Sequence, residues 1–154
     1  MSRRACDAAF FVALLATALA LGAALAHALE LPNKIGLGKD EYFIVQQIYR
    51  GWSWLGVLLL VELVSIATVI VAGWRTPSVR ASAIAALVCL IGAQALFWTF
   101  TYPANAATNN WTIQPDNWQA LRLQWEYSHA TGAALQIAAM ASLIRGALAR
   151  SGDR

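Results

Sequence analysis

Four apolar segments constrain this chain more than any other feature of its sequence. They cover residues 8–29, 52–73, 81–102 and 122–145, and each is long enough to cross the hydrocarbon core of a bilayer, which takes about 20 residues of helix. In lipid every backbone polar group must be bonded internally, so such segments form helices. The sequence therefore predicts an all-α integral membrane protein, a four-helix bundle of up-down-up-down topology that makes a single domain of residues 1–154.

The composition excludes several classes of function. Hydrophobic residues make up 59% of the 154 residues and charged residues only 12%, which is too apolar for an ordinary soluble domain. The net charge of +3 is small and its basic residues lie at segment ends and in loops, so no nucleic-acid partner is predicted. Cys6 and Cys89 are far apart and form no CxxC pair, which favours two buried thiols over a disulfide or a zinc knuckle.

The boundaries of the helices are predicted from capping residues and proline. The first segment is longer than the core of a secretory signal, so we expect it to stay in the protein as a span. We expect its helix to end at Pro32, because proline cannot continue the hydrogen-bond ladder, and residues 33–40 to form a loop. Asp116 and Gln119 resemble a capping box, which places the last helix from Asn117 to about Arg150.

The distribution of arginine predicts the orientation in the membrane. Arginines occur at both termini and in the short turn between the second and third segments, and basic residues favour the cytoplasmic side. These residues are Arg3, Arg4, Arg75, Arg80, Arg145, Arg150 and Arg154. We therefore expect both termini to be cytoplasmic, in a protein of the bacterial inner membrane.

The fourth segment carries a polar stripe that runs into the predicted membrane. At helical spacing Arg122, Glu126 and His129 fall on one face, and Gln136 lies a further i+7 step along it. Ionisable groups are costly in lipid, so those inside a bundle usually mark a functional site. Glu62, near the middle of the second segment, is the most deeply placed charge and a functional candidate for the same reason.

The outer ends of the first and fourth segments carry the same residue types in mirrored order. The first segment ends with His27 and Glu30, and the fourth begins with Glu126 and His129, each pair at i, i+3 spacing. We predict that the two helices are antiparallel neighbours. Their four side chains would then form one cluster near the outer face of the membrane.

Three functional interpretations and one structural interpretation fit this cluster. Imidazole and carboxylate donors on facing helices build di-iron and di-manganese centres and also suit iron, copper or zinc, so these four residues are candidate ligands of a transition metal. Haem held by the two histidines is the second interpretation. Acid–base chemistry on an apolar substrate, without a cofactor, is the third. In the structural interpretation, His–Glu and Arg–Glu pairs hold the helices together.

Several short motifs resemble those of a known family. They are the run His-Ala-Leu-Glu-Leu-Pro-Asn-Lys at 27–34, the run Gln-Gln-Ile-Tyr-Arg-Gly at 46–51, and the later residues Asn109, Asn110, Trp111, Trp118, Arg122, Trp125 and His129. Together they resemble the anthrone-oxygenase-like family of small four-helix membrane proteins. The resemblance implies a four-helix bundle and, from the fungal members, oxidation of anthrones to anthraquinones without a classical cofactor. It also implies functional roles for Trp118, Arg122, Trp125 and His129.

The leading prediction is a membrane-embedded oxidoreductase-like protein that acts on an apolar, aromatic or quinone-like molecule entering from the lipid. The competing prediction is a non-enzymatic accessory or assembly subunit of a larger membrane complex, and a homo-oligomer is a further expectation. In the enzymatic prediction the catalytic residues are Glu126, His129, Arg122 and Glu62, and the residues that bind or enclose the ligand are Trp98, Trp125 and Arg50.

Overall fold

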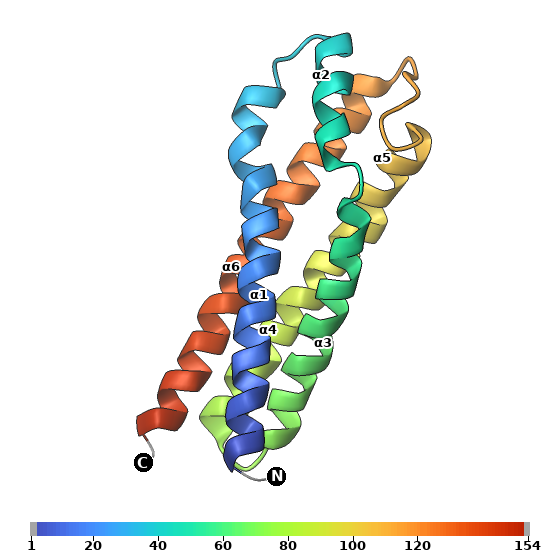
Figure 1. The fold of residues 1–154 in the computed structure, drawn as a ribbon. Coiled ribbons are helices and arrows are strands. Elements are labelled where there is room, and N and C mark those ends of the chain that lie inside the picture. The colour runs from blue at the N-terminus through green and yellow to red at the C-terminus, as the bar shows by residue number, and fades with distance from the viewer. Residues whose placement is uncertain (1–2, 153–154) are drawn as a thin grey trace.

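The computed structural model describes residues 3–152, and every regular element in that range is a helix. Four long helices dominate the fold (Figure 1): α1 (Arg3–Lys34), α3 (Leu55–Ala72), α4 (Pro77–Leu96) and α6 (Trp118–Gly152). The shorter elements are α2 (Lys39–Gln46), η1 (Gln47–Tyr49), η2 (Trp52–Trp54), the π-helical segment η3 (Phe97–Thr101) and α5 (Tyr102–Ala107). The predicted all-α class is confirmed.

The four long helices form a closed ring. Helix α1 packs against α3 and α6, and α4 packs against the same two helices. Both termini lie at one end of the bundle, which we call the terminal end (Figure 1). Helix α2, α5 and the connection at residues 108–117 lie at the opposite end, which we call the loop end.

Four helical segments are long and apolar enough to cross a membrane. They are Arg4–Lys34, Trp52–Ala72, Pro77–Ala107 and Trp118–Arg150. Large apolar side chains point outward from all four, which is the arrangement expected in lipid rather than in water. Examples are Leu15, Val57, Leu60, Val88, Ile91, Ile137 and Ile144. The fold is therefore consistent with an integral membrane protein.

The interior of the bundle is built largely from small residues. Ala13, Ala83, Ala86 and Ala139 are each at most 1% exposed, and the larger Ile66, Val69, Leu90 and Leu143 fill the space between them. Small residues let helix backbones approach closely, which is how helices associate in lipid. This packing holds the four helices in a fixed arrangement at the terminal end.

Two prolines lie inside helices, and one of them does so where the sequence predicted a helix end. Helix α1 continues through Pro32 to Lys34, so the prediction that it stops at Pro32 is wrong. A proline near a helix C-terminus removes one hydrogen bond only, and the backbone N–H of Ile35 still donates to Leu31, at 2.9 Å. Pro103 lies in the first turn of α5, directly after η3, where its missing N–H costs little. The extension of α1 places Lys34 inside the bundle rather than in a loop.

Candidate acid–base site at the loop end

Two histidines from distant parts of the sequence stack against each other at the loop end. The ring centroids of His27, on α1, and His129, on α6, are 4.1 Å apart, with an interplanar angle of 27°. The predicted adjacency of these two helices is confirmed. His27 is 7% exposed, and its Nδ1 atom is buried with no hydrogen-bond partner. The pair therefore offers a free nitrogen inside the bundle.

Aromatic rings surround the histidine pair. Tyr49, Trp52 and Trp125 lie with their ring centroids 4.4, 5.1 and 5.1 Å from that of His27. Trp125 also lies 4.2 Å from His129. The interplanar angles of 48°, 62° and 86° to His27 show that these rings meet the imidazole tilted or edge-on, so the surroundings of the pair are aromatic and apolar.

Lys34 is the unexpected member of this site. It is 3% exposed, and its Nζ atom lies 3.2 Å from Oε1 of Glu126, which is 1% exposed. The same Nζ lies 3.5 Å from Glu30 and donates to the hydroxyl of Tyr49 at 2.6 Å. It also lies over the rings of Tyr49 and Trp125, at 4.7 and 4.9 Å from their centroids. Lys34 and His27 thus contact the same two aromatic rings.

The short helix α2 supplies a further contact to the cluster. The hydroxyl of Tyr42, which is fully buried, donates to Oε1 of Glu126 at 2.9 Å, and the side-chain amide of Gln46 donates to the same hydroxyl. Burial and the nearby Glu126 carboxylate raise the pKa of Tyr42 far above its usual value. Tyr42 therefore stays a neutral hydrogen-bond donor.

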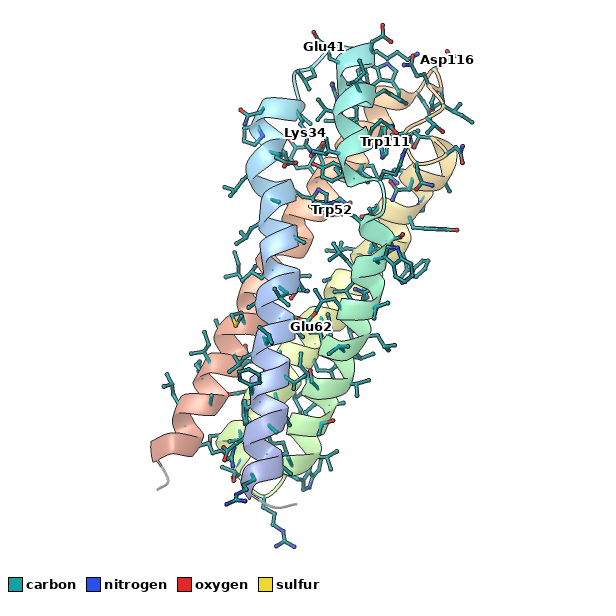
Figure 2. The ribbon with its side chains drawn as sticks, viewed as in Figure 1. Lys34, Glu41, Trp52, Glu62, Trp111 and Asp116 are labelled. Atoms are coloured by element: carbon teal, nitrogen blue, oxygen red, sulfur yellow. The ribbon has the colours of Figure 1, made fainter. Side chains whose placement is uncertain are left out.

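Tyr49 is a second neutral hydrogen-bond donor, and it also contacts Lys34. Its hydroxyl donates to the carboxylate of Glu30, and burial together with this carboxylate raises the pKa of Tyr49 well above the ordinary range. The side chain of Glu30 is 37% exposed, so it forms the edge of the cluster. One ammonium group, two carboxylates and two neutral phenols thus meet next to the histidine pair (Figure 2, around the Lys34 label).

Trp125 is held in place by an amide on another helix. The indole Nε1 of Trp125 donates to Oδ1 of Asn105, in α5, at 2.9 Å, and the indole of Trp111 donates to the same oxygen at 3.1 Å. Trp111 is 4% exposed and has a positive φ of 62°, like the preceding Asn109 and Asn110 at 45° and 54°. This left-handed turn brings the Trp111 ring against α2, within the loop end (Figure 2).

Some predicted site residues lie beside the cluster rather than in it. Arg122 stacks over the rings of Trp118 and Tyr42, at 4.6 and 5.4 Å, and donates to the carbonyl of Leu37 at 2.8 Å. It therefore supports Tyr42 and the start of α2. Glu62 lies about midway along the bundle, well below the loop end (Figure 2), and is bonded by Gln136.

Two other predicted residues are placed outside the cluster. Trp98 is 60% exposed and packs on Phe97 and Tyr102, because η3 presents it on the outside of the bundle. Arg50 is exposed and bonds to Gln47, beside an open hollow that Asp40 and Trp111 also line. Neither encloses the histidine pair.

The four predicted metal ligands are not gathered into one ligand group in this structure. Within residues 3–152, no group of three or more His, Cys, Asp and Glu side chains is gathered so as to hold a metal ion. His27 and His129 are adjacent, whereas Oε1 of Glu126 and Oε2 of Glu30 contact Lys34 and the tyrosines. Face-to-face imidazoles also do not fit haem ligation, in which two axial nitrogens point at the iron from opposite sides of the ring.

Comparison with known proteins adds no assignment: no protein-family model, curated protein or solved structure matches the chain. The class that fold and site define is a helical bundle with four helices able to span a membrane and a buried cluster of charged and aromatic residues near one end of it.

Proposed function

We propose that this protein is a membrane-embedded enzyme that oxidises an apolar aromatic molecule with an acidic C–H or O–H group. The observation that carries this proposal is the free, buried Nδ1 of His27 together with the buried ammonium group of Lys34, which lies over two of the rings that contact His27. A base next to a fixed positive charge is the arrangement needed to remove a proton and stabilise the anion that forms. Charged groups at this depth are costly, which is why they favour a functional role.

In the proposed reaction His27 accepts a proton from the substrate and Lys34 holds the resulting oxyanion. For an anthrone-like substrate, the CH₂ group and dioxygen are converted into a carbonyl group and water, with dioxygen as the oxidant. Glu126 and Glu30 act as positioning residues that hold the ammonium group of Lys34 in place. Trp125 and Tyr49 provide the flat walls against which an aromatic ring stacks.

The proposed topology is up-down-up-down, with both termini in the cytoplasm and the loop end on the outer side of the membrane. Its support is that both termini lie at the same end of the bundle (Figure 1), together with the short turn that carries Arg75 and Arg80. Basic residues favour the cytoplasmic side. The substrate would then reach the cluster from the outer half of the bilayer.

A structural role is the competing proposal, and one observation favours it. The bonds of Glu126 to Lys34 and Tyr42 join α6 to α1 and α2, so the cluster also ties the loop end together. An accessory subunit of a membrane complex would need these bonds and no substrate. Enzymatic turnover separates the two proposals.

The test uses the protein in lipid nanodiscs with anthrone as the probe. Oxygen consumption and formation of anthraquinone are measured for the wild type and for His27→Gln and Lys34→Met. Loss of a general base costs about 10²–10⁴-fold in rate, and loss of a group that stabilises an oxyanion costs about 10²–10³-fold, so both variants should fall by at least about 100-fold. Arg50→Gln and Trp98→Phe, which lie outside the cluster, should keep the wild-type rate. Equal rates in all five proteins would overturn the proposal.

A further inference from the structure

A second polar site lies in the middle of the bundle, away from the cluster at the loop end. Glu62, on α3, is fully buried (0% exposed) and sits about midway along the helices (Figure 2). None of the salt bridges among the described side chains includes it. The side chains beside its carboxyl group are Thr17 and Gln136, and both are neutral. An ionised carboxylate at this position would have no compensating charge, which is costly in a low-dielectric interior.

One hydrogen bond joins the side chains of Glu62 and Gln136, and one oxygen of each side chain has no partner. The Nε2 atom of Gln136 donates to Oε2 of Glu62 at 3.3 Å. The other oxygen of each group, Oε1 of Glu62 and Oε1 of Gln136, is buried without a partner. Two such oxygens cannot bond to each other when the carboxyl group is ionised, because both are acceptors only.

A single proton completes this arrangement. A carboxylic acid and a primary amide pair through two hydrogen bonds: the amide N–H donates to one acid oxygen, and the acid O–H donates to the amide oxygen. The first of these bonds is present, and a proton on Oε1 of Glu62 would supply the second. It would satisfy both unpartnered oxygens and remove the buried charge at once.

We propose that Glu62 and Gln136 form an acid–amide pair that binds a proton in the middle of the bundle. The pair joins α3 to α6, and the buried Thr17, beside the carboxyl group of Glu62, brings α1 to the same point. The site is distinct from the cluster at the loop end, and it stands whether or not that cluster is catalytic. A bound monovalent cation in place of the proton is the alternative outcome of the test.

Infrared spectroscopy at neutral pH distinguishes these states, because a protonated carboxyl group and a carboxylate absorb in different regions. The difference spectrum between the wild type and Glu62→Gln should show the loss of one protonated carboxyl band. The reciprocal double variant Glu62→Gln/Gln136→Glu keeps an acid opposite an amide, so the band should return. The exposed Glu41 provides a matched control, since Glu41→Gln should leave the band unchanged.

Two results would overturn the proposal. One is a difference spectrum that shows loss of a carboxylate band instead of a protonated one. The other is a carboxylate band that shifts when Na⁺ replaces choline in the buffer. That shift would assign the site to a cation. If Glu62→Gln does not fold, Glu62→Leu/Gln136→Leu serves as the reference, because it removes both polar partners together.

Discussion

Lys34 and Glu126 form a buried ion pair between α1 and α6, with 3.2 Å between Nζ and Oε1 and exposures of 3% and 1%. Tyr42 donates to the same carboxylate oxygen, and Tyr49 accepts from the same ammonium group. The pair therefore holds together two spans and both neighbouring tyrosines. A buried pair of this kind is sensitive to the loss of one partner only.

We expect Glu126→Gln and Lys34→Met each to lower the free energy of unfolding by about 3–5 kcal/mol, because each leaves one buried charge without its main partner. The double variant Lys34→Met/Glu126→Leu should recover most of this loss. Chemical unfolding in detergent measures all three. The control is Asp7→Asn. Asp7 pairs with Arg150, and their side chains are 49% and 19% exposed, so water screens this pair. Its loss should cost only about 0.2–1 kcal/mol. Additive losses in the double variant would contradict the prediction.

Because the phenol of Tyr42 is buried, we expect the protein to lose folding stability at alkaline pH. In the folded protein burial and Glu126 raise the pKa of Tyr42, whereas an unfolded chain loses this proton at a pH of about 10. The contribution of the neutral phenol is fully present below that pH and is lost as the pH rises above it. The thermal midpoint of Tyr42→Phe should therefore fall less steeply than that of the wild type above a pH of about 10. Tyr102→Phe, at a half-exposed position, is the control and should keep the wild-type slope.

The length of the four apolar segments was sufficient to predict the four helices, and helical spacing was sufficient to predict the polar stripe. The stripe of α6 faces inward as predicted at Glu126 and Gln136, which are 1% and 5% exposed. The mirrored positions of His27 and His129 were also sufficient to predict that α1 and α6 are neighbours. These features depend on the length of the apolar segments and on the order and spacing of residues along each helix, which can be read from the sequence.

The central role of Lys34 was not predicted, because Pro32 made the end of α1 look like a loop. A signal was present: Lys34 lies at i+7 from His27 and i+4 from Glu30, on one face of a continuing helix. Tyr42 and Tyr49 could not have been found in this way. Their positions depend on how the connection after α1 folds back onto the bundle, and no periodic pattern specifies that path.

A metal at the histidine pair is testable by elemental analysis of the purified protein. We expect no stoichiometric iron, copper or zinc, because the rings of His27 and His129 stack and the nearby carboxylates bond to Lys34 and the tyrosines. The absorption spectrum should likewise match that of the double variant His27→Ala/His129→Ala. A metal or a Soret band that is present in the wild type and lost in the double variant would show that the side chains rearrange around a cofactor.

The side-chain oxygen of Asn105 accepts hydrogen bonds from the indoles of both Trp125 and Trp111, at 2.9 and 3.1 Å. Asn105→Ala leaves two largely buried N–H groups without an acceptor, and each such loss costs about 1–3 kcal/mol. Asn105→Asp keeps the acceptor and should retain most of the stability. Trp125 borders both histidines, so its freed ring should also lower the turnover of anthrone by Asn105→Ala in nanodiscs. Thermal unfolding and oxygen consumption measured on the same samples separate the two effects. Wild-type values for Asn105→Ala in both would mean that the oxygen of Asn105 does not position Trp125.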